Sequence, residues 1–443
     1  MDLMMPCNAR LQFRYHHAMI AAAILFLASL MVLYSGSSGG LRSVLHDMVS
    51  VIRDSYCVRE WAPHRHFWHD MDAHPLPACT METCFNRSRC DASDIKHLKI
   101  YVYKHEECHY RHAEHTELPY YFRALSESPW VTDDPESACL LLVLLPPKPS
   151  GEPHCPFRSL PHWNGGVNHV IASLSDTLPS DIIANPASIG MASMAASCLQ
   201  LTSFRPGFDV SIPLPGLSHF RHLAPLPPRA RKYFLTFKGK RYIGNKEGNF
   251  RSDPSFRSLN NLRDVIVVTS CNHTTNNRIR ARCPHLNTGC DDDEAMFTKY
   301  RYEELMNSTF GLAPAGRSSS SYRIIEVMSA GAIPVIVADN YVEPLESGKL
   351  MIEWGRCALR FETIDIVSIL PALRAMSEEE LRSRQAYCVR VYEEYLKDDN
   401  ALLGSVVRFL FLRLNFTNNN TTSKSSWRTL LMTFLYLSSH PLV

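Results

Sequence analysis

Residues 308–335 read STFGLAPAGRSSSSYRIIEVMSAGAIPV, and this stretch decides the fold class. Its succession of apolar, small and polar residues predicts a strand, a loop of small residues, a helix and a buried strand, at 310–314, 315–320, 321–330 and 332–338. The helix is expected to be capped by Ser320 or Ser321. A strand, a helix and a second strand in this order form the repeating unit of an α/β architecture with a parallel sheet.

The same pattern continues on both sides of this stretch. Runs of β-branched, aromatic and aliphatic residues predict strands at 98–103, 138–145, 168–173, 208–213, 233–237 and 264–269, and helices are expected at 117–126, 302–307 and 376–396. A proline-rich break at 223–228 predicts an N-terminal α/β domain at 96–225 and a C-terminal α/β domain at 226–400. We expect two Rossmann-type domains that face each other across a cleft. The remainder, 401–443, is expected to be a tail without an assigned function.

Length and charge restrict the function classes. The chain has 443 residues, which suits two domains of ordinary size with additional segments. Its formal net charge is only +2, and basic and acidic residues are nearly balanced. A nucleic-acid-binding protein usually shows a clustered basic excess, so we expect no nucleic-acid partner.

The N-terminus carries a targeting signal. Residues 18–34 form an apolar run that is preceded by Arg10 and Arg14. The run is at the short end of what spans a bilayer and suits the thinner membranes of the ER and Golgi. The arginines predict a cytoplasmic tail at 1–17 and a lumenal body, so that 18–34 is a transmembrane signal-anchor of a single-pass type II protein. A signal peptide cleaved near Ser35 is the alternative.

Cysteines and glycosylation sequons support a secretory body. The cysteines include two clusters of three, within 79–90 and within 271–290. Neither cluster has the paired spacing of a zinc site, so disulfides are favoured over metal binding, with the connectivity left open. Sequons N-x-S/T occur at Asn86, Asn272, Asn307, Asn415, Asn419 and Asn420. The segment 35–95 is expected to be an irregular, disulfide-pinned stem, and metal binding by its histidines is the alternative.

The loop at 315–320 and the start of the following helix have the composition of a diphosphate site. A small-residue loop before a helix N-terminus offers free backbone N–H groups and the positive end of the helix dipole. Arginines there can add bidentate phosphate contacts, and a glutamate can accept hydrogen bonds from ribose hydroxyls. The candidate ligand-binding residues of this stretch are Gly316, Arg317, Ser320, Ser321, Arg323 and Glu326. The alternative is an ordinary strand–helix corner with a serine-rich loop.

A second basic patch follows the strand at 233–237. Lys238 and Arg241 come at the carboxyl end of that strand, where α/β sheets bind their ligands. Together with the loop at 315–320, they would place positive charge on both sides of a leaving pyrophosphate. The alternative is a solvated basic turn.

Several stretches of the chain resemble, in order, the exostosin domain of glycosyltransferase family 47. They are CTMETCF at 79–85, KIYVY at 99–103, DPESACL at 134–140, WNGGVNH at 163–169, FRPGFDVSIP at 204–213, RKYFLTFKGKRY at 231–242 and the block at 316–334. The similarity covers residues 79–400. It is strongest to the N-terminal halves of the animal exostosins that polymerise heparan sulfate.

This resemblance implies a GT-B fold, with the acceptor-side domain at 96–225 and the nucleotide-sugar-binding domain at 226–400. It also implies a UDP-sugar donor, no permanently bound cofactor, and an inverting transfer without a metal ion. It implies that a sugar, glucuronic acid first of all, is transferred to a growing glycan or proteoglycan such as heparan sulfate. Family members pair as heteromers, so another exostosin is the expected protein partner. The expected location is the Golgi or ER membrane, with the catalytic domain in the lumen.

The sequence departs from the family pattern at three positions. Family members usually carry Arg where Ala315 stands and Gly where Ser320 stands, and the polymerising exostosins have an acidic residue about where Pro146 stands. These changes favour the alternative of a catalytically weak or silent subunit that stabilises an active exostosin partner. A lectin-like glycan-binding protein is a further hypothesis, although it would not need basic residues for a diphosphate. Other donors, such as UDP-galactose or UDP-xylose, stay open.

An inverting transfer needs a general base for the acceptor hydroxyl. His169, in the turn before a strand, and Asp209, in the strand at 208–213, are the catalytic candidates. For His169 the alternative is a hydrogen bond that forms the turn. Residues 291–294 contain the D-x-D pattern of metal-dependent transferases, but they follow a polar loop rather than a buried strand. We therefore expect a solvated acidic turn there and no metal site.

Overall fold

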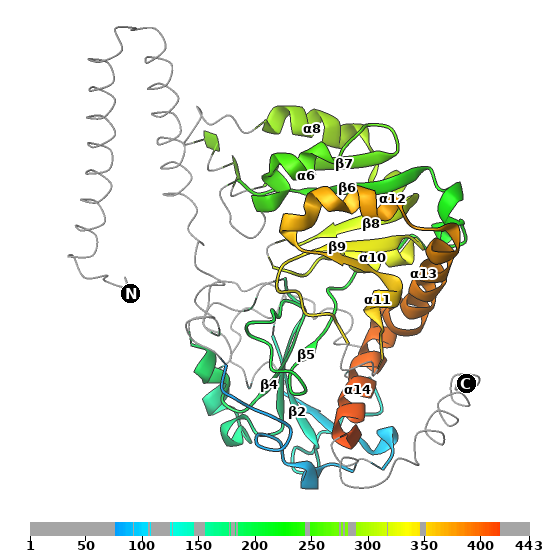
Figure 1. Cartoon of the computed structure of the whole chain (residues 1–443). Coiled ribbons are helices and arrows are strands. Elements are labelled where there is room, and N and C mark those ends of the chain that lie inside the picture. The colour runs from blue at the N-terminus through cyan, green and yellow to red at the C-terminus, as the bar shows by residue number, and fades with distance from the viewer. Residues whose placement is uncertain are drawn as a thin grey trace, which may run out of the picture. The chain divides into compact units, whose positions relative to one another are not determined.

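A computed structural model gives the structure of the chain (Figure 1). It describes residues 76–91, 93–104, 107, 125, 127–145, 156–176, 178, 182, 185–243, 249–273, 276–277, 280–281, 289–316, 318–345 and 351–416. The chain divides into two compact units, and every helix and strand named below belongs to the unit made of His64–Asn272 and Gly289–Val443. Within the described part of the chain, no helix is long and apolar enough to cross a membrane. The anchor expected at 18–34 lies outside the described residues.

The first sheet has five parallel strands in the order β1-β2-β3-β4-β5. The strands are β1 (Ile100–Val102), β2 (Leu140–Leu144), β3 (His169–Ser173), β4 (Ser193–Ala196) and β5 (Val210–Ser211). Every residue of β3 and β4 is buried. Both faces of a parallel sheet are covered, which explains why its strands are apolar runs rather than alternating sequences.

The second sheet is also parallel and has the order β10-β9-β8-β6-β7. Its strands are β6 (Tyr233–Lys240), β7 (Val265–Ser270), β8 (Ser308–Pro314), β9 (Ile333–Val337) and β10 (Leu359–Phe361). The α/β fold with two parallel sheets, predicted from the sequence, is thereby confirmed. The two short strands β4 and β10 were not predicted, because SMAA contains no β-branched or aromatic residue and LRF is too short to establish an alternation.

The helices connect and cover the strands. The α-helices are α6 (Pro254–Ser258), α8 (Cys290–Lys299), α9 (Tyr302–Met306), α10 (Arg323–Ser329), α11 (Trp354–Cys357), α12 (Ile369–Arg374), α13 (Glu378–Val391) and α14 (Asp399–Phe416). Short 3-10 helices lie at Arg87–Arg89, Ile95–His97, Phe157–Ser159, Asn164–Gly166, Pro186–Ile189, Arg221–Leu223, Pro228–Ala230, Asn249–Ser252 and Thr363–Ser368. The helix α10 connects β8 to β9, as the stretch at 308–335 predicts.

The C-terminal end of the folded unit differs from the expected tail. A π-helical turn, Tyr392–Leu396, follows α13 and leads into α14. The apolar face of α14 packs on the first sheet and lines an apolar cavity there, with Leu402, Leu403, Val406, Val407 and Leu410. This spacing is the i, i+3, i+4 pattern of an amphipathic helix, so the start of the segment 401–443 is part of the core. Figure 1 shows α14 running from the second sheet to the first.

Disulfides fix the segments around the two sheets. Among the described residues, the pairs are Cys79–Cys84, Cys90–Cys139, Cys271–Cys290 and Cys357–Cys388. Both expected cysteine clusters therefore form disulfides. Leu76 and Met81 are buried, so the end of the expected stem at 35–95 packs into the folded unit.

The carboxyl edges of the two sheets are in direct contact. Gln200, after β4, forms an isolated bridge with Tyr341, after β9. In β5, the Ser211 hydroxyl donates to the Val342 carbonyl at 3.1 Å, and the Ser211 carbonyl accepts the Leu345 N–H at 2.9 Å. The carboxyl ends of parallel strands are where α/β proteins bind their ligands, so both candidate ligand edges meet in this region.

Candidate functional site

The serine-rich loop after β8 contacts the first sheet through Ser320. The Ser320 hydroxyl donates to the carbonyl of Ser197, in the segment that follows β4. The N–H of Ser197 in turn donates to the carbonyl of Ser173, the last residue of β3, at 3.1 Å. The loop at 315–320 therefore lies where the carboxyl edges of both sheets meet, as expected for a ligand-binding loop.

The loop folds back on itself before α10. The N–H of Gly316 donates to the carbonyl of Ser318 at 2.9 Å, and the Ser321 hydroxyl accepts the N–H of Arg323 at 3.4 Å. The helix begins at Arg323 after Tyr322, slightly later than the expected cap at Ser320 or Ser321. Arg317 lies outside the described residues.

Two buried guanidinium groups flank the ring of Phe237 in β6. Arg251 lies 5.3 Å and Arg323 lies 5.1 Å from the ring centroid. Arg251 donates to one carbonyl of β6 and one of β8, at 2.9 and 2.7 Å. Arg323 also donates to one carbonyl of each of these strands, at 2.9 and 3.1 Å. The two side chains therefore bring two positive charges to the carboxyl half of the second sheet.

Neither guanidinium forms an ion pair with a carboxylate of the described residues; their hydrogen bonds go to backbone carbonyls. Burial, together with the charge of Arg323, lowers the pKa of Arg251 to about 10, so the side chain remains charged at neutral pH. A buried charge is costly unless it is paired. This pair of cations therefore favours an anion at the same edge.

Several buried polar atoms at the carboxyl edges of the two sheets have no hydrogen-bond partner among the described residues: Arg251 Nε, Arg323 Nη2 and Ser319 Oγ at the second sheet, and Ser173 Oγ at the end of β3 in the first. Arg231, just before β6, offers a comparison, because it is equally buried and also bonds only to carbonyls. All three of its nitrogens have partners. Buried polar groups normally find partners, so the unpartnered atoms of Arg251 and Arg323, which lie at one ring, indicate a place for a polar ligand.

Glu326 makes contacts within the protein. Its carboxylate is 3% exposed, with Oε1 accepting the N–H of Leu217 at 3.1 Å and Oε2 accepting the hydroxyl of Tyr302. A ribose hydroxyl would have to replace or share one of these partners. The structure thus places Glu326 one helical turn from the loop at 315–320 and holds it against the linker between the sheets.

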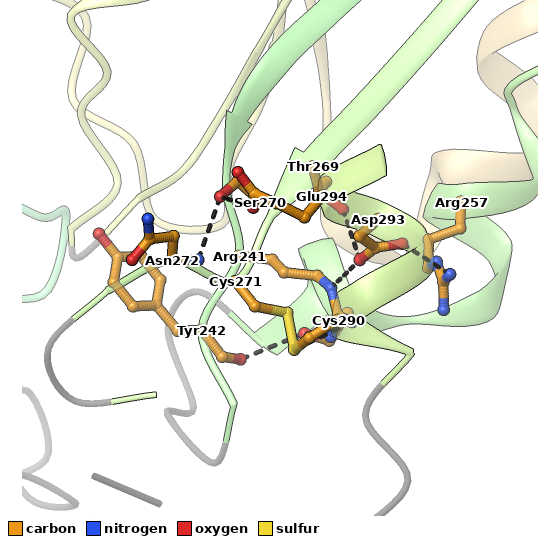
Figure 2. Close-up of polar contacts among 11 residues, drawn as sticks. Arg241, Tyr242, Arg257, Thr269, Ser270, Cys271, Asn272, Cys290, Asp293 and Glu294 are labelled. Carbon is orange, nitrogen blue, oxygen red and sulfur yellow. Dashed lines mark hydrogen bonds and ion pairs between the residues drawn. A yellow bond between two sulfur atoms is a disulfide. The ribbon is translucent and has the colours of Figure 1, made fainter. Parts of the chain in front are cut away.

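The basic patch at the end of β6 supports α8. Lys238 Nζ donates to the carbonyl of Phe297 at 2.7 Å and to that of Tyr300, at the carboxyl end of α8. Burial lowers the pKa of Lys238. Arg241 Nε donates to Asp293 Oδ2, in the first turn of α8, at 2.5 Å (Figure 2). Lys238 and Arg241 were expected to face a pyrophosphate. In the structure they form hydrogen bonds at the carboxyl end and in the first turn of α8, respectively.

The acidic motif at 291–294 is the first turn of α8 rather than the solvated turn that the sequence suggested. Asp293 is buried and also accepts hydrogen bonds from Arg257 Nη2 at 2.8 Å and from the Thr269 hydroxyl at 3.0 Å (Figure 2). Acidic residues are favourable in the first turn of a helix, and two arginines balance this carboxylate. Within the described ranges, no group of three or more metal-ligating side chains is found.

His169 is the first residue of β3 and is 2% exposed. Nδ1 lies 2.9 Å from the carbonyl of Val167, and Nε2 lies 3.0 Å from the hydroxyl of Tyr103. A carbonyl can only accept, so Nδ1 carries the proton. Burial lowers the pKa of His169 to about 4, and the ring therefore stays neutral. The structure places this candidate base at the amino edge of the sheet, away from the loop at 315–320.

Asp209 precedes β5 and is fully buried. Its carboxylate accepts three hydrogen bonds from Arg205, from the backbone N–H at 2.9 Å, from Nε at 2.9 Å and from Nη2 at 2.7 Å. A fourth comes from the N–H of Met194 at 2.7 Å. These contacts hold β4 and β5 at their amino ends, and they leave the carboxylate without access to an acceptor sugar.

Arg251 is the site residue that sequence reasoning missed. It lies in the 3-10 helix Asn249–Ser252, within a polar stretch that shows neither strand nor helix periodicity. Its position over Phe237 depends on how β6 and β8 are paired, which no local pattern reveals. A basic residue shortly after a basic strand end was the only available signal.

Comparisons with known proteins identify the family of this chain. The sequence model described as the Exostosin GT47 domain matches residues 95–376. Exostosin-1 of Drosophila melanogaster is 31% identical over 361 residues, which are 76% of this chain and 44% of that protein. Exostosin-1 of Bos taurus is 29% identical over 335 residues, with shares of 72% and 43%. The chain thus spans less than half of the length of these relatives.

Among solved structures, a glycosyltransferase from Rickettsia africae ESF-5 is similar with a TM-score of 0.34 and 10% identity, over 76% of this chain and 82% of that one. An OtsA apo structure is similar with a TM-score of 0.36 and 13% identity, over 69% and 81%. Scores of this size support no conclusion about fold or function. The family model, in contrast, covers well over half of the chain, in agreement with the motifs at 163–169, 204–213 and 231–242. The chain belongs to the exostosin family, glycosyltransferase family 47.

Proposed function

We propose that this protein is a UDP-sugar-dependent glycosyltransferase whose donor diphosphate binds at the carboxyl edge of the second sheet, between the loop at 315–320 and Arg251. The observation that supports this site is the pair of buried guanidinium groups around Phe237, which lack a carboxylate partner among the described residues. Membership of a glycosyltransferase family supports the reaction class.

A diphosphate would complement this edge in charge and in hydrogen bonding. Guanidinium groups bind phosphate oxygens through two parallel N–H donors, and such charge-assisted bonds are stronger than neutral ones. Arg251 and Arg323 would supply the charge, and the backbone and hydroxyls of 318–320 would add neutral donors. Arg317, in the same loop, is the further candidate ligand that the sequence proposes. The same donors would stabilise the negative charge that develops on UDP as the glycosidic bond forms.

The finer points of the reaction rest on the family resemblance. We propose a GT-B arrangement of the two α/β halves, an inverting transfer without a metal ion, and glucuronic acid as the sugar. The acceptor would be a glycan of the heparan sulfate type. Because members of the family that the chain resembles pair as heteromers, a second exostosin subunit is the proposed partner. A Golgi or ER membrane location with a lumenal catalytic unit fits the disulfides.

Calorimetry with UDP and with UDP-glucuronic acid tests the donor site. The purified chain should bind UDP with micromolar affinity. Arg251→Lys keeps the positive charge but removes the planar guanidinium group with its parallel N–H donors. The loss of charge-assisted hydrogen bonds worth about 1.5–3 kcal/mol should weaken UDP binding by about 10- to 100-fold. Arg317→Ala should weaken binding as well.

Arg231→Lys is the matched control. Arg231 is as buried as Arg251, bonds only to carbonyls and lies at the opposite edge of the sheet, so its replacement should leave the Kd within about twofold. A chain that binds no UDP-sugar would contradict the proposed function. In that case the silent-subunit role, with stabilisation of an exostosin partner, would be the remaining hypothesis.

A further inference from the structure

One carboxylate follows the central strand of the first sheet, at the edge that the serine-rich loop contacts. Asp176 comes three residues after Ser173, the end of β3, and is half-buried. The carbonyl of Ser173 accepts the N–H of Ser197, and the carbonyl of Ser197 accepts the hydroxyl of Ser320. Three residues of extended chain span at most about 10 Å. Asp176 therefore lies within about 10 Å of Ser173, which is linked through Ser197 to the loop that we assign to the donor diphosphate.

Asp176 follows β3, the central strand of the first sheet, at the edge that contacts the second sheet. Cys198 directly follows Ser197 and is fully buried. Burial raises the pKa of the Cys198 thiol, and the negative charge of Asp176 raises it further, in agreement with this position.

Among the described residues that follow strands of the first sheet, one other carboxylate occurs at this edge, that of Glu107. It follows the outer strand β1, two strands from β3. It accepts hydrogen bonds from the hydroxyl of Tyr101 at 3.1 Å and from the N–H of Lys104 at 2.7 Å. Glu107 follows the outermost strand of the sheet, whereas Asp176 follows the central strand β3, whose last residue is linked through Ser197 to the loop at 315–320.

We propose that Asp176 is the general base of the transfer, which rests on the function proposed above. The acceptor hydroxyl oxygen attacks the anomeric carbon of the donor sugar, and the bond from that carbon to the β-phosphate oxygen breaks with its electron pair going to UDP. The proton of the acceptor hydroxyl moves to the Asp176 carboxylate. Neither His169 nor Asp209 meets this requirement, because both lie buried at the amino edge of the sheet.

The test combines donor binding and turnover in Asp176→Asn, with Glu107→Gln as the matched control. UDP affinity is measured by calorimetry. Transfer is measured as UDP release from UDP-glucuronic acid with an oligosaccharide that ends in N-acetylglucosamine, and UDP-galactose and UDP-xylose are tried as donors as well. A general base contributes about 10²–10⁴-fold, so Asp176→Asn should lower kcat by at least about 100-fold with the Kd for UDP within about twofold. Glu107→Gln should stay within about threefold of the wild type in both measurements.

Further measurements distinguish a catalytic role of Asp176 from a structural one. Asp176→Glu, which keeps a carboxylate at this position, should recover part of the rate that Asp176→Asn loses. An Asp176→Asn variant that transfers within about threefold of the wild type would overturn the assignment, as would one that loses UDP binding together with transfer. A wild type that binds UDP but releases none from any of these donors would also overturn it. Absence of UDP binding in the wild type would instead contradict the proposed function itself.

Discussion

Replacement of Asp209 distinguishes a structural carboxylate from a catalytic one. Asp209 is fully buried and receives four hydrogen bonds, three of them from Arg205, whose side chain is 10% exposed. In Asp209→Asn the buried guanidinium of Arg205 loses its counter-charge. The NH2 group of the new amide would also face N–H donors of Arg205 or Met194, which need an acceptor. Removing one partner of a buried ion pair costs about 3–5 kcal/mol, because the other charge stays buried and unpaired.

The expected result is a free energy of unfolding that is lower by about 3–5 kcal/mol in urea denaturation followed by tryptophan fluorescence. The control is Asp264→Asn, which disrupts the ion pair between Asp264 and Arg374. Both side chains of this pair are more than a third exposed. An exposed pair contributes at most about 1 kcal/mol, so the control should differ little from the wild type. An Asp209→Asn variant with unchanged stability and no transfer would refute this reasoning and restore Asp209 as a candidate base.

Two further predictions concern the cores of the two sheets. Burial lowers the pKa of His169 to about 4 from 6.5, so between these values the unfolded chain binds a proton that the folded chain does not. Stability should therefore fall by up to about 3 kcal/mol from pH 7 to pH 4 and stay flat above pH 7, and urea titrations of His169→Gln should lack this component. In Gly311→Ala, the new Cβ would lie 2.7 Å from Val327 Cγ1, which forces β8 and α10 apart. Overpacking should cost about 1–3 kcal/mol, and thermal melts should show that Gly311→Ala with Val327→Ala loses less than the sum of the single changes.

The fold could be predicted from the sequence where local signals are strong. The stretch at 308–335 contains a strand, a loop and a helix whose patterns differ sharply, and β8, α10 and β9 follow it closely. The position of α14 could not be predicted in the same way. Its apolar residues form a helical stripe, but packing on the first sheet requires the chain to return across the molecule, which is a tertiary contact.

The candidate site could be predicted only in part. The small-residue loop was found because its composition is unusual, and Ser320 does contact the first sheet. His169 and Asp209 were predicted as catalytic residues because their side chains can accept a proton. Both are buried in the structure, and their burial depends on the packing of the sheet, which no local sequence pattern shows. Lys238 and Arg241 lie at the end of a strand as expected, but both side chains form hydrogen bonds with residues of α8.

The crystal structure of the chain with bound UDP would test the proposed donor site most directly. We predict that the diphosphate lies at the carboxyl edge of the second sheet, in contact with the guanidinium group of Arg251 or Arg323 and with the loop at 315–320. A diphosphate bound elsewhere, for example through a cation at the acidic turn 291–294, would contradict the proposed site.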